Sequence, residues 1–394
     1  MTPWEHLEHL SRLGPRPIGS PSNDAAAAYI TGVFARAGLA VEEQPYACTS
    51  WEHARTSLRI LGGEDPEVDA EANAFSVSCD VTAPVVAAGT VDELVAVAGT
   101  GRILVLYGDL ARTPLAPKSW FLKDERDDRI IRALEAMRPA AVLSPPTGTD
   151  YYGQLTEDWE FDLPAATISP ADARRILRLR GAELHLRIDA HRAAATARNI
   201  VGRSGAAAGR RIVVCAHFDT KFGTPGACDN GGGAATLLAL AERLTRPDGA
   251  DGAPLPALEF VAFNGEEYLP VGDDEYLRRR EGRLDDVAAA VNLDGVGLLL
   301  GAPTITTMSP GDEFDTTVRA VAARRPGVVW VDPWPESNHS TFAMRGIPSV
   351  ALSSTGFARV SHYPTDTIDG LGPERLEEVA ELVDEIVRRL APIC

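Results

Sequence analysis

The sequence predicts an α/β fold built on an open β-sheet, with a second domain inserted into the first. Four short apolar segments each end on side chains that can bind metal, as strands do at the carboxyl edge of a parallel sheet. Between about residues 77 and 190 the sequence pattern changes, and short strand-like runs alternate with loops. With 394 residues the chain is also longer than one ordinary domain requires.

Composition excludes several functional classes. The formal net charge is −18, whereas nucleic-acid-binding proteins carry positively charged surfaces, so we expect no nucleic-acid partner. Apolar residues make up 45% of the chain, and no run is long enough to span a membrane. The five cysteines are odd in number and scattered, unlike a disulfide framework. The acidic, polar first ten residues do not resemble a signal peptide, so we expect a cytoplasmic location.

The first domain is expected to begin with two helices, at residues 2–13 and 25–37. Leucines at helical spacing support the first helix, and Gly38 ends the second. Two strands should follow, at residues 39–46 and 56–61, where apolar and polar residues alternate.

The inserted domain is assigned to residues 77–190, which leaves residues 1–76 and 191–394 as the principal domain. Its expected strands are short and apolar, and they lie at residues 85–88, 103–107, 140–143, 165–168 and 184–188. No histidine precedes His185 in this block, and no cluster of metal-binding residue types occurs there. Residues 199–202 mark the return to the principal sheet.

The stretch from residue 211 to 240 is the part of the sequence that most strongly indicates a metal site. A buried strand at residues 211–215 leads to His217, Asp219 follows, and a loop rich in glycine and proline closes on Asp229. Glycines at 231–233 then allow a helix to start close to the sheet. Buried histidine and carboxylate groups are costly unless they are paired, and zinc is a suitable partner.

The same arrangement recurs after three more expected strands, which lie at residues 258–264, 288–293 and 348–354. These strands lead, respectively, to Glu266 and Glu267, to Asp294, and to His362 with Asp366. Singly, such motifs are common in turns and helix starts, but the carboxyl ends of parallel strands meet at one edge. Helices at residues 314–324, 340–345 and 374–390 complete the principal domain.

Convergence of these residues predicts a site for two metal ions. The expected ligands are two histidines and three carboxylates: His217, Asp229, Glu267, Asp294 and His362. If Asp229 bridges, each metal receives three protein ligands and keeps an open position for a shared water. Glu266 is then available as the general base, and Asp219 can fix the tautomer of His217.

Six segments resemble the M28 family of zinc peptidases: AHFDT, GACDNGGGAATLLALA, FNGEEYLPVGDDEY, VNLDGVG, SNHSTFAMRGIPSVAL and SHYPTDTID. The amino-terminal LGPRPIGSPSNDAAAAYI is also similar to that family. The resemblance implies a three-layer α/β/α sandwich with a mixed, largely parallel eight-stranded sheet. It further implies a di-zinc aminopeptidase with two Zn²⁺ per chain, acting on a small peptide or amide.

The resemblance also implies a role for each site residue. His217 and Asp294 would bind one zinc, Glu267 and His362 the other, with Asp229 as the bridge and Glu266 as the base. The inserted block more weakly resembles a protease-associated (PA) domain, through GRILVLYGD and LPAATISPADARRIL.

Two departures from the family pattern concern the substrate. Ser361 stands where many relatives have a tyrosine that helps to hold the oxyanion, which leaves the oxyanion donor open. Asn338 precedes His339 where many aminopeptidases have an aspartate, which leaves the substrate class open. The candidate substrate contacts are Asn338, His339 and Arg359. An arginine near a ligand can hold a substrate carboxylate, but we favour the interpretation that Arg359 is solvated or pairs with an acid, and we expect a substrate with a free amino terminus.

An aminopeptidase is therefore the leading interpretation. A carboxypeptidase or N-acyl amidohydrolase of the same fold is the first alternative. A single-zinc transferase of the glutaminyl-cyclase kind and a non-catalytic binding relative are further alternatives. The presence of both His217 and Asp294 argues against the single-zinc enzyme, and the presence of Glu266 argues against the binding relative.

Overall fold

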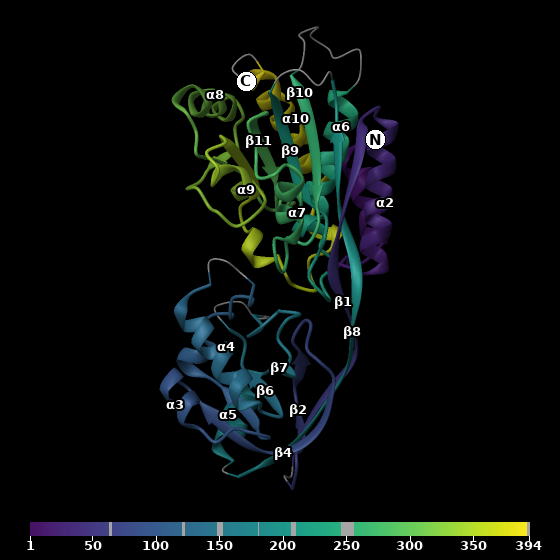
Figure 1. Ribbon diagram of the computed structural model, residues 1–394. Coiled ribbons are helices and arrows are strands. Elements are labelled where there is room, and N and C mark those ends of the chain that lie inside the picture. The colour runs from purple at the N-terminus through teal and green to yellow at the C-terminus, as the bar shows by residue number, and fades with distance from the viewer. Residues whose placement is uncertain are drawn as a thin grey trace. The chain divides into compact units, whose positions relative to one another are not determined.

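The computed structural model describes residues 1–62, 65–119, 123–147, 153–179, 181–205, 210–245 and 256–391 (Figure 1). The chain divides into two compact units. Unit 1 comprises Met1–Cys48 and Ala195–Cys394, and unit 2 comprises Thr49–Ala194. Unit 2 is wider than the 77–190 assigned from sequence, because the expected strands at 39–46 and 56–61 are one continuous strand, β1 (Ala40–Ile60). This strand carries the chain out of unit 1, and β8 (Glu183–Arg203) carries it back.

Unit 1 is built on a mixed sheet with the strand order β13-β12-β14-β11-β9-β10-β8, and β1 pairs with β8. Its other strands are β9 (Arg211–His217), β10 (Ala257–Phe263), β11 (Val287–Leu293), β12 (Pro303–Met308), β13 (Val329–Trp330) and β14 (Ser349–Ser354). The four central strands β14, β11, β9 and β10 are mutually parallel. The pairing sets His217 level with Phe263, so the carboxyl ends of β9 and β10 coincide.

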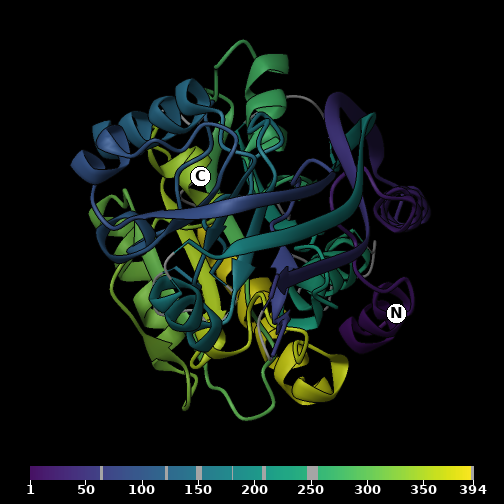
Figure 2. The ribbon, with the colours of Figure 1, turned by 90° about the horizontal axis from the view of Figure 1, so that it is seen from below.

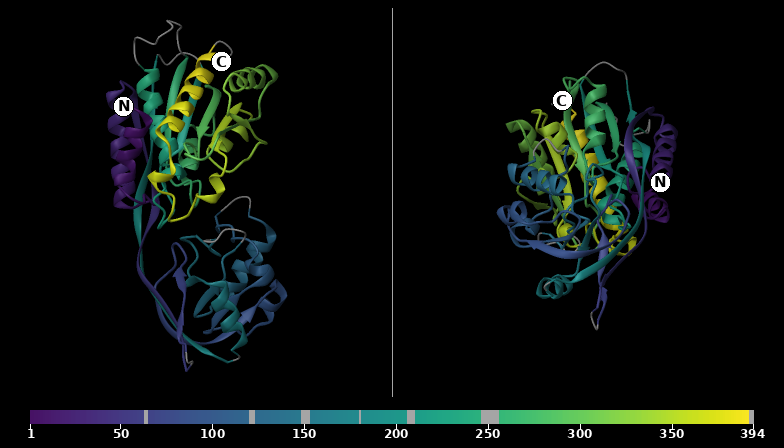
Figure 3. Two further views of the ribbon diagram at one scale, coloured as in Figure 1. Left: turned by 180° about the vertical axis from the view of Figure 1, so that it is seen from behind. Right: turned by 60° about the horizontal axis from the view of Figure 1, so that its bottom comes forward.

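Helices cover both faces of this sheet. Figure 3 (left) looks onto one face, which is covered by α1 (Pro3–Arg12), α2 (Pro21–Arg36), α6 (Gly232–Leu244), α8 (Asp312–Ala323) and α10 (Pro373–Leu390). The other face carries α7 (Val271–Arg279) and α9 (His339–Ala343), visible in Figure 1. Side chains alternate along β9: Val214 packs with the first set of helices and Val213 with the second. The predicted three-layer α/β/α sandwich is thereby confirmed.

Three short helical elements complete the described part of unit 1. They are η2 (Ala227–Gly231), η3 (Phe357–Arg359) and η4 (Ile368–Gly370).

Among the described residues, no helix combines the length and apolar character that crossing a membrane requires.

Unit 2 has its own sheet and core. Its elements are β2 (Glu67–Val68), β3 (Ala70–Ala72), β4 (Cys79–Ala88), α3 (Val91–Ala96), β5 (Ile103–Leu106), η1 (Gly108–Ala111), α4 (Glu125–Met137), β6 (Ala141–Ser144), β7 (Ala165–Ile168) and α5 (Pro170–Arg178). The strand order is β8-β4-β5-β6-β7-β3, and Figure 2 shows β4 (blue) beside β8 (teal). Buried Leu104, Ile130 and Val142 join strands and helix in one core. Assignment of unit 2 as a PA domain stays a prediction.

Candidate metal centre

The residues expected to bind metal all follow strands or begin a helix at one edge of the unit 1 sheet. His217 is the last residue of β9, and Asp294 directly follows β11. Glu267 lies in the turn after β10, Asp229 lies in η2 before α6, and His362 follows η3. The sheet registers explain the convergence, since the central strands end side by side.

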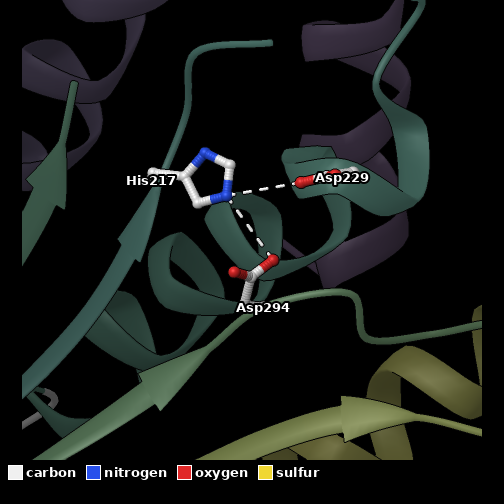
Figure 4. Close-up of side chains that lie close together, drawn as sticks. All are labelled: His217, Asp229 and Asp294. Carbon is white, nitrogen blue, oxygen red and sulfur yellow. Dashed lines mark ion pairs between the residues drawn. The ribbon is translucent and has the colours of Figure 1, made fainter. Parts of the chain in front are cut away.

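One group of three side chains surrounds His217 (Figure 4). The His217 Nε2 atom lies 3.4 Å from Asp229 Oδ1 and 3.5 Å from Asp294 Oδ1. Figure 4 shows both carboxylates pointing at this nitrogen from different elements. All three residues are buried, with exposed fractions of 1%, 3% and 5% for His217, Asp229 and Asp294.

A second group uses the other oxygen of Asp229. The His362 Nε2 atom lies 3.2 Å from Asp229 Oδ2 and 3.1 Å from Glu267 Oε2. Within each group the atoms that can bind metal lie within 4.8 Å of one another. Asp229 therefore belongs to both groups and presents one carboxylate oxygen to each histidine.

Several atoms in these groups lack the hydrogen bonds that burial requires. Both ring nitrogens of His217, Oε1 of Glu267 and Oδ1 of Asp294 are buried without a hydrogen-bond partner in the described part of the chain. An unsatisfied buried polar atom costs about 1–3 kcal/mol. Nitrogen and carboxylate oxygen are also the donors that zinc accepts, so the residues present fit this ion.

The electrostatics of the protein alone indicate an excess of negative charge. Burial opposes protonation of His217, but the carboxylates of Asp294 and Glu266 outweigh it and raise its pKa well above the usual value. Burial, together with the carboxylate of Asp229, raises the pKa of Glu267 to about 7. Protonation and a bound cation are two ways to offset such charge.

Two further carboxylates hold these groups in place without joining them. Asp219 Oδ1 lies 3.6 Å from His217 Nδ1, and its oxygens accept the backbone N–H groups of Glu266 at 3.3 Å and Glu267 at 3.2 Å. Asp366 accepts the backbone N–H groups of Cys228 at 2.7 Å and Asp229 at 3.0 Å. Each therefore fixes the backbone of a residue that is expected to bind metal.

Glu266 faces the centre but belongs to neither group of three. Its Oε2 atom lies 3.8 Å from His217 Nε2, and 24% of its side chain is exposed. Burial raises the pKa of Glu266 well above its usual value. His217 opposes this increase, and the carboxylates of Asp294 and Glu267 add to it. A carboxylate placed beside the centre in this way is available for proton transfer.

The three expected substrate contacts lie in two different environments. Asn338 and His339 are buried: Asn338 Nδ2 donates to Asp273 at 2.9 Å, and His339 Nε2 lies 2.6 Å from the carbonyl oxygen of Trp334. Arg359 is exposed on η3, three residues before His362. Contact of these residues with a substrate stays a prediction.

Sequence reasoning missed the residues that support the centre from the amino-terminal segment. Asn264, two residues before Glu266, exchanges two side-chain hydrogen bonds of 2.9 Å with Asn23 of α2. Tyr46 of β1 donates to the carbonyl oxygen of Asn264. Arg16 is fully buried beneath the loop after His217. The signal that could have found them was the likeness to the family of residues 13–30, which include Arg16 and Asn23.

Comparison with known proteins agrees with this geometry. The sequence profile of peptidase family M28 matches residues 199–387, which contain all five expected metal ligands. A probable leucine aminopeptidase of Arthroderma otae is 28% identical over 195 residues, or 46% of this chain and 54% of that protein. A probable lipoprotein aminopeptidase of Mycobacterium tuberculosis is 23% identical over 77% of this chain and 59% of its own length. The chain thus spans little more than half the length of these curated relatives.

Solved structures extend the likeness over nearly the whole chain. An aminopeptidase from Aneurinibacillus sp. strain AM-1 superposes with a TM-score of 0.76 at 23% identity, covering 99% of this chain and 93% of that one. A zinc aminopeptidase from Bacillus subtilis gives a TM-score of 0.77 at 22% identity, covering 98% and 94%. The match at residues 199–387 bears out the resemblance seen in the sequence: this part of the chain matches peptidase family M28, and the chain shares its fold with zinc aminopeptidases.

Proposed function

We propose that this protein is a zinc-dependent aminopeptidase that hydrolyses short peptides or amides with two Zn²⁺ ions per chain. The observation that carries the proposal is the position of Asp229 in two ligand groups at once. A carboxylate shared in this way is what a pair of metal ions a few ångströms apart requires.

The ligands divide between the two ions according to the two groups. His217 and Asp294 would hold one ion, Glu267 and His362 would hold the other, and Asp229 would contribute to both. When bound, the ions lower the pKa of a coordinated water and stabilise negative charge on both sides of the displacement. Bound ions would also provide partners for the buried oxygens of Asp294 and Glu267 that lack hydrogen bonds.

Glu266 is the general base in this proposal. It takes a proton from the attacking water and delivers it to the nitrogen of the leaving group. Its backbone N–H is held by Asp219, so the carboxylate is aimed by a fixed turn rather than by a mobile loop. Loss of a positioned acid or base typically costs about 10²–10⁴-fold in rate.

Asp219 has a second task besides holding this turn. Its Oδ1 lies on the Nδ1 side of His217, while Nε2 faces Asp229 and Asp294. A carboxylate at Nδ1 keeps the proton on that nitrogen and leaves Nε2 free to bind metal. Asp219 thereby sets the tautomer that the proposed ligand role of His217 requires.

Preference for a free amino terminus follows from the charge of the centre. The carboxylates of Glu266, Glu267, Asp229 and Asp294 together suit a cationic α-amine. The curated relatives from Arthroderma otae and Mycobacterium tuberculosis are both named as aminopeptidases. The oxyanion donor has to differ from the tyrosine expected in the family, because Ser361 occupies that position.

The test is hydrolysis of an amino-acid amide by purified protein, with and without a chelator. We expect turnover that chelation abolishes and that added zinc restores. Protein that carries two zinc ions and hydrolyses no amide, peptide or N-acyl substrate would contradict the proposal and favour a non-catalytic role.

A further inference from the structure

Arg16 is a fully buried arginine whose surroundings are unusual for a charged side chain. It lies between α1 and α2 and is 1% exposed. Its guanidinium donates four hydrogen bonds, and every acceptor is a main-chain carbonyl oxygen rather than a carboxylate. Burying a charged guanidinium without a paired carboxylate costs free energy, so packing alone does not explain an arginine at this position.

Three of the four acceptors lie at the two ends of one loop, and the fourth is Gly14, two residues before Arg16. Nε donates to Phe218 at 3.0 Å, whereas Nη1 and Nη2 donate to Pro225 at 3.3 Å and Gly226 at 2.8 Å. Phe218 directly follows the proposed ligand His217, and Gly226 precedes Asp229 by three residues. The guanidinium therefore joins the start of the 218–226 loop to its end.

The loop closed by Arg16 is tightly folded. Gly226 has a φ of +65°, and a Cβ at this position would lie 2.1 Å from Thr220 Cγ2 and 2.7 Å from the carbonyl oxygen of Asp229. Thr220 also accepts the backbone N–H of Arg16 at 2.9 Å. The Arg16 segment is thus fixed to the same loop by its main chain and by its side chain.

Arg16 also places a positive charge beside the acidic centre. Burial lowers its pKa to about 10, against the opposing effect of Asp366, Asp219 and other carboxylates of the centre, so the guanidinium is charged at neutral pH. Among the described residues, no carboxylate forms an ion pair with it at contact distance. Its charge therefore acts on the carboxylate cluster as a whole.

We propose that Arg16 is a positioning residue for the metal centre, which closes the 218–226 loop and so fixes His217 and Asp229 at the spacing that one metal ion requires. This inference rests on the proposed metal-dependent function. It concerns the geometry of the ligands and assigns Arg16 no contact with substrate. A purely structural arginine would contribute to folding stability without changing the affinity for zinc.

The experiment measures the dissociation constant for zinc by competition with a chromophoric chelator, together with the thermal unfolding midpoint of the metal-free protein. Arg16→Lys keeps the charge and loses the forked geometry. Arg203→Lys is the matched control, because Arg203 hydrogen-bonds the buried Glu259 four residues before the end of β10. We expect Arg16→Lys to weaken zinc binding about 10–100-fold, as loss of an outer support does. Arg203→Lys should lower the unfolding midpoint and leave zinc affinity unchanged.

Zinc affinity of Arg16→Lys equal to that of the wild type would overturn the inference. So would an equal loss of affinity in both variants. If Arg16→Lys does not fold, Thr220→Val decides, because it removes the hydroxyl that accepts the backbone N–H of Arg16 and leaves the guanidinium in place. We expect a smaller loss of zinc affinity there, and no loss would count against the role of Arg16. Wild-type protein that binds zinc without hydrolysing peptides would refute the proposed function alone, whereas wild-type protein that binds no zinc would refute both.

Discussion

The carboxylate of Asp366 accepts a hydrogen bond of 3.0 Å from the backbone N–H of Asp229. Asp229 is the residue that two ligand groups share, so the position of its backbone sets the geometry of both. Asp366 lies four residues after His362 in the sequence. One short segment thus carries a proposed ligand and also holds the proposed bridge.

Replacement of Asp366 should therefore weaken metal binding without removing a ligand. We expect Asp366→Asn to raise the dissociation constant for zinc about 10–100-fold, because the amide has one acceptor oxygen and one of the two backbone N–H groups would lose its acceptor. Asp369→Asn, at an exposed carboxylate in η4, is the control and should bind zinc like the wild type. Identical affinities of the two variants would show that Asp366 does not support the bridge.

Glu266 and Glu267 are neighbours with different proposed roles, which substitution separates. Glu266→Gln should retain both zinc ions and lose about 10²–10⁴-fold in kcat, as expected for a general base. Glu267→Gln should lose metal from one group first, because Glu267 Oε2 lies beside His362 Nε2. Zinc content and kcat measured on both proteins check the assignment. The reverse pattern would exchange the two roles.

Stability of unit 1 should depend on the protonation of His6, a buried residue of α1 that belongs to neither proposed ligand group. Burial lowers the pKa of His6 to about 4, despite the attraction of Glu242. In the unfolded chain this pKa is about 6.5, so the unfolded state binds more protons between those two values. Stability is therefore gained as the pH rises from about 4 to 6.5 and is lost as the pH falls through the same window.

The measurement is the free energy of unfolding at pH 4.5 and pH 7.5 for the wild type and for His6→Gln. His6 contacts Tyr29 Oη through Nδ1 at 2.8 Å, so glutamine retains a polar group near this partner. We expect the pH dependence of the wild type to exceed that of the variant by up to about 3 kcal/mol. His191→Gln, at an exposed position in unit 2, should leave the dependence unchanged. Equal pH dependence in His6→Gln and wild type would argue against this assignment.

Matched pairs of peptides can show which end of the substrate the protein recognises. A peptide with a free amino terminus should be cleaved faster than the same peptide with that amine acetylated, because the centre is rich in carboxylates. Arg359→Ala should have little effect, since Arg359 is exposed and forms no ion pair with a carboxylate among the described residues. Equal cleavage of both peptides with a large loss in Arg359→Ala would favour a carboxypeptidase or an N-acyl amidohydrolase.

Much of the centre could be predicted because its residues follow strands. His217, Glu267 and Asp294 lie at strand ends, and parallel strands bring those ends together whatever the loops do. The glycine-rich start of α6 likewise indicated that Asp229 faces the same edge. Local sequence was therefore sufficient to predict that these residues converge, and their binding of metal stays a prediction.

The supporting residues could not be predicted in the same way. Arg16 and Phe218 are 202 positions apart in sequence, and Asn23 and Asn264 are 241 apart. Such contacts depend on how α1 and α2 pack against the sheet, which local patterns do not specify. The start of unit 2 was missed for a related reason, since β1 continues through the residues where two separate strands were expected.

The zinc content of active protein tests the central claim most directly, because the claim is that Asp229 serves two metal ions at once. Elemental analysis should return two zinc ions per chain in fully active protein, and activity should fall in proportion as a chelator removes them. Full activity with one zinc ion per chain, or with none, would contradict the account.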